Sequence, residues 1–479
     1  YIDDHQKAIA EDFIELLSLP NVATNLGDIY ANASYIQGLF EDRGFFTERL
    51  VLGLETRPVI IGHLNVGAEK TVTIYIHYDG QPVDESRWAT PAFEPVLRAG
   101  RLEDDAEIID LETFEGDFLN EFRFYGRSAS DDKAPIIALL YALDAMKAAG
   151  IKPSVNIKLF LEGEEEAGSP SLKSIVDRHK DKLASDFWLF FDGPQDQRGN
   201  PRVVLGVRGT FGFGLTVYGP IRGLHSGHYG NFAPNPSLRL AHLLASMRTE
   251  DGNTLIEGFY DEVRAAGSLE KSLIAAIPSA DALIMRDAGI SDREYPNLRY
   301  EETHLIPALN IRGLQAGGVG DKARNIIDSR AIASVGIRLV PDMTLEKTIE
   351  VVEAHIRAEG YFITYDEPTL EDRLAHPKIA KIDWSKAGYA AVRANADDPF
   401  VAKTIEIMQD ISGGETLIYP ILGGSLPLAH IVLPLDVPFV VLPIANQDNS
   451  QHAPNENIRV GHLFKGIEIY AALLAGLGE

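Results

Sequence analysis

Residues 71–82 read TVTIYIHYDGQP, an apolar run that leads into a histidine and an aspartate. The β-branched and aromatic residues of Thr71–Tyr78 predict a strand. Because side chains alternate along a strand, His77 and Asp79 are expected on the same face. A metal-bound imidazole needs a partner for its other ring nitrogen, often a carboxylate, and Asp79 is placed to be that partner. An isolated His-x-Asp is more often a strand-end turn with a surface Asp, so the motif has to be judged together with its neighbours.

Strands and helices alternate on both sides of this strand. Further strands are expected at Pro58–Ile61, Glu121–Tyr125, Ser154–Leu161, Phe187–Phe191 and Phe439–Pro443. Helices are expected at about Ile2–Leu17, Asp28–Arg43, Ala134–Ala149, Ser171–Leu183 and Pro399–Ile411. The order predicts an α/β fold class: a catalytic domain with a mostly parallel sheet and helices on both faces.

Acids or a histidine follow four other expected strands. They lie in GRSASDDK at 126–133, EGEEEAGS at 162–169, the acid Asp192, and SQHAPNE at 450–456. Each alone has an ordinary explanation as a helix cap or a solvated acidic turn. Open α/β sheets, however, bind ligands at the carboxyl ends of their strands, and clustered carboxylates indicate a bound cation or a raised pKa. Together these segments supply two histidines and several acids, a donor set suited to divalent ions.

The pattern changes near Gly206–Gly214. An alternating strand at 208–222, a helix at 236–247, a strand at 331–339, a helix at 345–358 and a strand at 361–365 predict an inserted α+β open-faced sandwich. Residues 251–300 look like a helical elaboration of it. We therefore expect a catalytic domain in two parts, 1–207 and 393–479, with the inserted domain at 208–392.

Composition excludes several classes of protein. The 479 residues, 45% hydrophobic and 24% charged, are typical of a globular protein, and 70 acids against 44 bases give a net charge of −26. This charge disfavours nucleic acid as a partner. Without cysteine, every metal ligand must be His, Asp or Glu, and no apolar run is long enough for a membrane span. The chain begins without Met, which is consistent with a removed leader, and cytoplasmic, periplasmic and secreted locations all stay open.

With these motifs in this order, the chain resembles the M20 metallopeptidases, the group of carnosine-type dipeptidases, glutamate carboxypeptidases and aminoacylases. The resemblance implies two divalent ions, zinc first, with manganese or cobalt as alternatives. It assigns metal ligands to His77, Asp131, Glu166, Asp192 and His452, with Asp131 bridging the ions. It makes Glu165 the general base toward a metal-bridging water and Asp79 the residue that orients His77.

The inserted segment resembles the lid and dimerisation domain of that family. The resemblance implies a homodimer and assigns substrate binding to His225, Asn325, Arg338, Gly424 and Ser425, with His225 reaching the partner's site. The implied substrate is a dipeptide or short peptide, and Asp192 rather than Glu favours the dipeptidase side. An N-acyl amino acid hydrolase or a carboxypeptidase of the same family is the alternative. A two-metal phosphatase and a binding protein on a decayed hydrolase fold are the rivals outside it.

Overall fold

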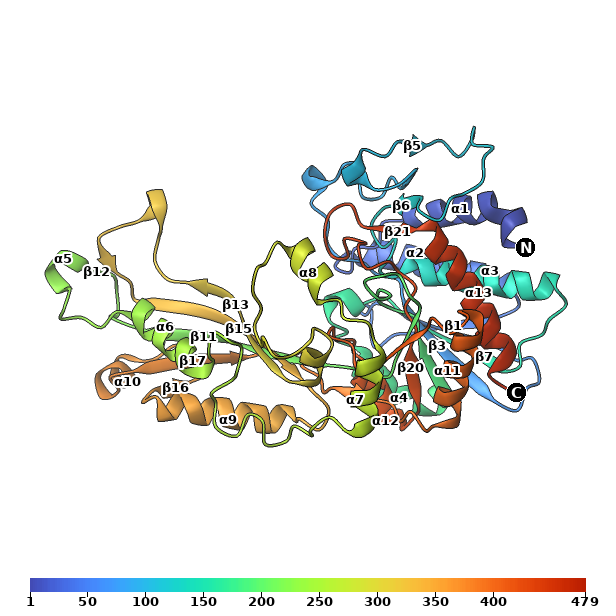
Figure 1. Ribbon diagram of the computed structural model, residues 1–479. Coiled ribbons are helices and arrows are strands. Elements are labelled where there is room, and N and C mark those ends of the chain that lie inside the picture. Colours follow the sequence, from blue (N-terminus) through green and yellow to red (C-terminus); the bar gives the residue numbers. More distant parts are fainter. The chain divides into compact units, whose positions relative to one another are not determined.

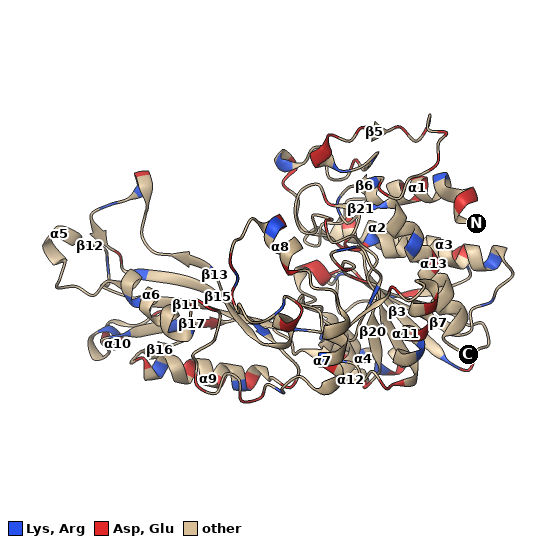
Figure 2. Cartoon of the chain, in the orientation of Figure 1, with Lys and Arg blue, Asp and Glu red and all other residues tan.

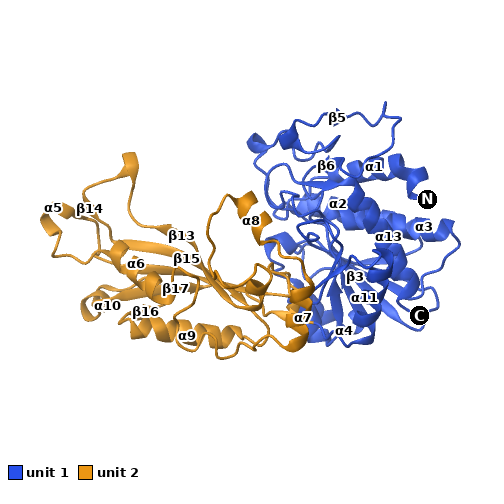
Figure 3. Ribbon diagram, in the orientation of Figure 1, with its two compact units in different colours: residues 1–206, 394–420, 430–479 blue, residues 207–393, 421–429 orange.

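The computed structural model describes residues 1–479, which form two compact units (Figure 3). Unit 1 comprises residues 1–206, 394–420 and 430–479, and unit 2 comprises 207–393 and 421–429. We expected 421–429 to belong to the second part of the catalytic domain, and this was wrong. The segment packs with unit 2 because Val207 bridges to Leu422 and the Arg208 side chain donates to the Gly423 carbonyl.

Unit 1 is built on an eight-stranded sheet with the order β1-β2-β7-β3-β8-β20-β9-β19. Figure 1 labels β1, β3, β7 and β20 of this sheet. Its strands are β1 (Phe46–Leu50), β2 (Val59–Leu64), β3 (Thr71–His77), β7 (Asn156–Glu162), β8 (Phe187–Phe190), β9 (Arg202–Val204), β19 (Leu417–Tyr419) and β20 (Phe439–Val441). The central pairs β7–β3, β3–β8 and β8–β20 are parallel, whereas β1–β2, β2–β7 and β20–β9 are antiparallel. The sheet is thus mixed. Its parallel centre carries the strands predicted at Thr71–Tyr78, Ser154–Leu161, Phe187–Phe191 and Phe439–Pro443, whereas β2, predicted at Pro58–Ile61, is antiparallel to both neighbours.

Seven α-helices accompany this sheet in unit 1. They are α1 (Ile2–Ser18), α2 (Leu26–Glu41), α3 (Lys133–Ala148), α4 (Leu172–Leu183), α11 (Pro399–Ile411), α12 (Ala429–Leu435) and α13 (Val460–Gly476). The first turns and middle of α3 are buried on every side, and α3 packs against α1 and α13. A helix that is apolar all round belongs in the interior. Its N-terminus, where Asp131 precedes it, is therefore firmly held.

A second, antiparallel sheet in unit 1 has the order β21-β6-β4-β5. Its strands are β4 (Val96–Arg98), β5 (Ile108–Ile109), β6 (Arg123–Tyr125) and β21 (Asn457–Arg459). Of these we expected only β6, and we expected it in the main sheet, which was wrong because β6 pairs with β4 and β21 instead. Tyr125 pairs with Asn457, so the loop after β6 and the loop before β21 run side by side. This pairing brings the 126–131 and 450–456 segments together.

Unit 2 is a five-stranded sheet with the order β13-β15-β11-β17-β16. The strands are β11 (Gly209–Tyr218), β13 (Ala308–Gln315), β15 (Arg330–Leu339), β16 (Phe362–Thr364) and β17 (Ile379–Trp384). Helices α6 (Pro236–Met247) and α9 (Leu345–Ala358) supply Leu243 and Val352 to one apolar core shared with Leu215 and Val335 of the sheet. The open-faced sandwich is as expected, although β13 and β17 were not foreseen.

Short elements complete unit 2. They are β10 (Gly206–Val207), β12 (Leu224–His225), β14 (Ile326–Ile327), β18 (Val392–Arg393), α5 (Ser226–Tyr229), α7 (Ser268–Ala276), α8 (Asp281–Ala288) and α10 (Leu370–Ala375). Helices α7 and α8 are the helical elaboration expected between 251 and 300. Charged residues of both signs are spread along the helices of both units (Figure 2). No helix has both the length and the apolar character needed to cross a membrane.

Candidate active site

The carboxyl ends of three neighbouring parallel strands carry the predicted residues. In register, His77 at the end of β3 lies opposite Glu162 at the end of β7, and Tyr75 lies opposite Phe190 at the end of β8. Residues just after these strand ends therefore meet at one edge of the sheet. This is why the segments at 77–79, 164–166 and 192, which are far apart in sequence, come together.

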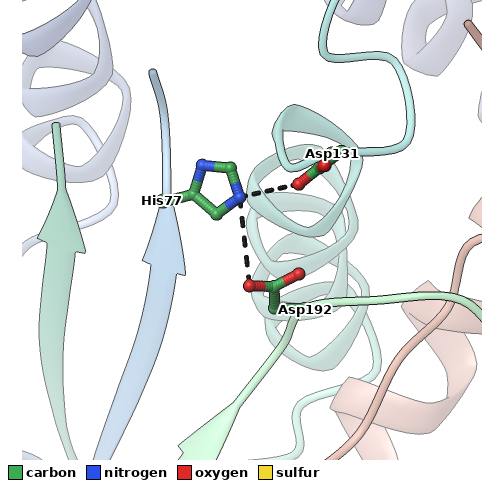
Figure 4. A group of neighbouring side chains, drawn as sticks. All are labelled: His77, Asp131 and Asp192. Carbon is green, nitrogen blue, oxygen red and sulfur yellow. Dashed lines mark hydrogen bonds and ion pairs between the residues drawn. The ribbon is translucent and has the colours of Figure 1, made fainter. Parts of the chain in front are cut away.

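The first group of side chains is His77, Asp131 and Asp192 (Figure 4). His77 Nε2 lies 2.8 Å from Asp131 Oδ1 and 3.9 Å from Asp192 Oδ2. All three side chains are buried and point toward one another from β3, from the segment before α3 and from the end of β8. The Asp131–Asp132 peptide is cis.

The second group is Asp131, Glu166 and His452. His452 Nε2 lies 3.0 Å from Asp131 Oδ2 and 3.3 Å from Glu166 Oε2. Asp131 thus offers one oxygen to each group, Oδ1 toward His77 and Oδ2 toward His452. Within each group the potential ligand atoms all lie within 4.8 Å of one another.

The donors in these groups fit divalent cations. Asp192 Oδ2 is buried and accepts no hydrogen bond, although a buried polar atom without a partner is costly and normally satisfied. A cation next to this oxygen would satisfy it. Imidazole and carboxylate together form a ligand set suited to zinc and its neighbours in the first transition row. The clusters are therefore able to hold metal.

The pKa values of the candidate ligands, in the protein without an ion, also favour a cation site. Burial raises the pKa of Asp192 to about 7, and burial together with Asp131 raises the pKa of Glu166 to about 8. The hydrogen bond to Asp131 raises the pKa of His452 to about 9. Burial opposes ionisation of Asp131, but its hydrogen bonds to the two imidazoles hold the Asp131 pKa below its usual range. Without a cation, bound protons offset the clustered negative charge that a metal ion would otherwise neutralise.

Asp79 and Glu165 lie beside the clusters. Asp79 accepts the backbone N–H groups of Glu165 at 3.1 Å and Glu166 at 2.9 Å, which fixes the turn carrying both glutamates. Asp79 Oδ1 is also 3.5 Å from His77 Nδ1, longer than a good hydrogen bond. The Glu165 carboxylate is in the electrostatic field of Asp192, Glu166 and His77, and its burial raises its pKa well above the ordinary value.

Glu456 is one residue of the site that sequence reasoning missed. Its carboxylate accepts from the Arg127 guanidinium at 2.7 Å, from the backbone N–H groups of Ser128, Ser130 and Asp131 at 3.0 Å each, and from Ser130 Oγ at 2.9 Å. All these contacts are buried. Glu456 therefore determines the path of the loop that carries Asp131. The acid stood in the quoted SQHAPNE segment, but its partners depend on the pairing of β6 with β21.

Two glutamines were also missed. Gln451 Nε2 donates to Asp131 Oδ2 at 2.6 Å, and Gln81 Nε2 donates to Glu166 Oε2 at 2.6 Å. Each occupies a carboxylate oxygen of the second cluster. Gln451 directly precedes His452, and Gln81 lies two residues after Asp79, so nearness in sequence to predicted site residues was the available signal.

The expected substrate-binding residues all belong to unit 2 and fall into two places. His225 and Asn325 are exposed, and β12 pairs with β14 beside them, with the Ser226 N–H donating to the Asn325 carbonyl. Arg338, Gly424 and Ser425 form the other place, where Arg338 Nη1 donates to Ser425 Oγ at 2.6 Å. Within one chain, His225 and Arg338 do not share a contact.

Comparisons with known proteins agree with this geometry. The sequence model of Peptidase family M20/M25/M40 matches residues 73–476. The chain is 26% identical over 440 residues to the Cys-Gly metallodipeptidase dug1 of Schizosaccharomyces pombe, covering 88% of this chain and 83% of that protein. It is 27% identical over 434 residues to the human Beta-Ala-His dipeptidase, covering 88% and 78%.

A solved structure extends the likeness to three dimensions. The M20 family metallo-carboxypeptidase Sso-CP2 from Sulfolobus solfataricus superposes with a TM-score of 0.81 at 27% identity, covering 98% of this chain and 99% of that one. The matched region contains the sheet edge with both clusters as well as the inserted unit. The chain is accordingly a metallopeptidase, and it belongs to peptidase family M20/M25/M40.

Proposed function

We propose that this chain is a two-metal dipeptidase whose centre is organised by Asp131. The observation that carries the proposal is that the two oxygens of Asp131 face two different ligand groups, one with His77 and Asp192 and one with Glu166 and His452. A bridging carboxylate between two three-residue groups is the arrangement that a pair of ions needs.

The first ion would be held by His77, Asp192 and Asp131, and the second by Glu166, His452 and Asp131. Zinc is the preferred identity, with manganese and cobalt as alternatives that the same donors accept. When bound, such a pair polarises the scissile carbonyl and lowers the pKa of a water between the ions. Asp79 positions the glutamate turn and lies on the Nδ1 side of His77, where it favours the tautomer with Nε2 free for a metal.

Glu165 would act as the general base. Its carboxylate accepts no hydrogen bond from the chain and lies in neither ligand group, while its backbone is held by Asp79. It is therefore free to take a proton from the attacking water and return it to the leaving amine. Proton transfer of this kind contributes roughly 10²–10⁴-fold to rate.

The inserted unit would bind the substrate's ends. The Arg338 guanidinium and the Gly424–Ser425 loop suit a carboxylate, because a guanidinium fork matches its two oxygens. We further propose a homodimer in which His225 and Asn325 serve the partner's site, His225 as a donor to the developing oxyanion. Both residues are exposed and distant in sequence from the clusters, as a contribution in trans requires.

The dimer proposal has a direct test. Subunits carrying His225→Ala are mixed with subunits carrying Glu165→Gln, and exchange is checked by mass. If His225 acts across the interface, each mixed dimer keeps one intact site, so activity reappears from two nearly inactive parents. No recovery after proven exchange contradicts the trans role.

The named relatives support a dipeptide substrate, since the two curated ones act on Cys-Gly and Beta-Ala-His. The structural relative is named a metallo-carboxypeptidase, so release of a C-terminal residue from a longer peptide or an N-acyl amino acid is the second candidate. The test is a hydrolysis screen with dipeptides, tripeptides, N-acyl amino acids and a phosphate ester, with zinc and manganese supplied in turn. Fastest turnover of dipeptides supports the proposal, whereas turnover of N-acyl amino acids alone contradicts it.

A further inference from the structure

Unit 2 contains an apolar cavity of about 280 Å³ that the proposed chemistry does not use. Its walls come from α8 and from the segment leading into β13, and Ile284, Met285, Leu298 and Ile306 are among the apolar residues that line it. The cavity is several times the roughly 30 Å³ that one water occupies in the liquid. It therefore has room for a large side chain.

The cavity adjoins the place where Arg338 and Ser425 meet. Ala308 lines the cavity and lies directly opposite Arg338 in the β13–β15 pairing. The Tyr300 ring, also in the lining, packs edge-on against His304 at 4.6 Å between ring centroids. His304 in turn covers Gly423, where an added Cβ would lie 2.6 Å from the imidazole. The cavity wall therefore packs against the 421–429 loop through Tyr300 and His304.

Two arginines face this loop without a carboxylate partner. Arg208, which lines the cavity, donates from Nε to the Gly423 carbonyl at 2.9 Å, and Arg338 donates to Ser425 Oγ at 2.6 Å. Neither guanidinium forms an ion pair with an acid of the chain. Burial, reinforced by Arg338, lowers the pKa of Arg208 to about 10. Two neighbouring cations in a poorly solvated place favour an anion between them.

The other charged groups of the lining are already paired. Asp281 forms an ion pair with Arg293, and Glu294 pairs with Arg248 at 2.7 Å. Arg208 is therefore the cavity's uncompensated charge, and it stands at the side nearest the loop. The matching ligand has a carboxylate directly beside an apolar group, which describes the C-terminal residue of a peptide.

We infer that this cavity binds the side chain of the substrate's C-terminal residue, while Arg208 joins Arg338 in binding its carboxylate. The inference rests on the proposed function and assigns it a substrate class: dipeptides that end in a large apolar residue such as Leu or Phe. In hydrophobic pockets a single methylene changes kcat/KM by about 10–200-fold. A C-terminal Leu is thus preferred over Gly by at least about tenfold.

The test compares hydrolysis of Ala-Gly, Ala-Leu and Ala-Phe by the metal-loaded enzyme. Met285→Trp fills the cavity from α8, Met285→Ala enlarges it, and Asp287→Asn on the exposed side of the same helix is the control. Met285→Trp is expected to lower kcat/KM for Ala-Leu and Ala-Phe about tenfold or more, mainly through KM, to lower kcat/KM for Ala-Gly far less, and to keep the melting temperature of the parent. Met285→Ala shifts the preference toward Ala-Phe.

Arg208→Met provides a second, independent arm. It is expected to raise KM about tenfold for dipeptides with a free carboxylate and to reduce their advantage over the same dipeptides with a C-terminal amide. The inference is overturned, while dipeptide hydrolysis stands, if Met285→Trp lowers kcat/KM equally for all three dipeptides. It is also overturned if Arg208→Met leaves the preference for a free carboxylate over an amide intact. If the parent enzyme cleaves none of the three dipeptides, the proposed function fails and the inference fails with it.

Discussion

The Arg127 guanidinium donates a 2.7 Å hydrogen bond to the Glu456 carboxylate, and both side chains are buried. The two residues lie in different segments of unit 1, far apart in sequence. Their contact joins the loop before α3 to the loop before β21. Since Glu456 also accepts three backbone N–H groups of residues 128–131, this ion pair supports the position of Asp131.

Glu456→Gln is therefore expected to weaken both folding and metal binding. Removing one partner of a buried ion pair costs about 3–5 kcal/mol, because the other charge stays buried without compensation. Urea unfolding should show this loss, and the purified variant should retain less zinc than the parent. Glu415→Gln changes an exposed acid of the same unit and serves as the control. Parent-like stability and metal content in Glu456→Gln would show that the network is dispensable.

Glu165→Gln should retain metal and lose turnover. The amide cannot accept the proton of the attacking water, so kcat is expected to fall by about 10²–10⁴-fold. Glu166→Gln is the informative counterpart, because loss of a ligand should reduce metal content as well as activity. Elemental analysis beside initial rates checks both variants. Metal loss in Glu165→Gln, with metal retained in Glu166→Gln, would exchange the two roles.

Metal uptake should release protons, and affinity should rise with pH. In the protein without an ion, the pKa values of Asp192, Glu166 and His452 are raised to about 7, 8 and 9. These groups hold protons at pH 6 that an ion must displace, and they hold progressively fewer as pH rises to 9. Calorimetric titration of zinc into stripped protein, in buffers of different ionisation enthalpy, counts the protons. An affinity that is flat across this range would be inconsistent with the raised pKa values.

Chelation should lower the melting temperature of the protein by several degrees. The ligands come from segments at 77, 131, 166, 192 and 452, so an ion binds the folded state and not the unfolded chain. At a hundred times its dissociation constant, one ligand contributes about 2.7 kcal/mol. Scanning calorimetry before and after metal removal measures the shift, and re-addition of zinc should reverse it. Asp192→Asn, with one weakened group, should show a smaller shift than the parent.

The parallel centre of the catalytic sheet could be predicted because its strands are short and apolar, and an acid or a histidine lies at or after the end of each. A residue that follows such a strand must lie at the carboxyl edge, so His77, Glu166 and Asp192 were placeable without knowing any contact. The segments of Asp131 and His452 were also expected after strands, but their approach depends on the pairing of β6 with β21 in a separate sheet, which leaves little trace in the sequence.

Other features depend on tertiary contacts that local patterns do not encode. The 421–429 segment lies among catalytic residues in sequence, yet its backbone contacts are with Val207 and Arg208 of unit 2. Glu456 resembles any surface acid until its five donor groups are known. Strand β13 was missed because its outer face is exposed and polar residues interrupt it.

Titration of metal-stripped protein with zinc, with hydrolysis of a dipeptide followed at each step, tests the two-metal centre most directly. We predict no turnover in the stripped protein and a rate that reaches its plateau at two equivalents of zinc per chain. Full activity in the stripped protein, or a plateau at one equivalent, would contradict a centre in which Asp131 joins two ions.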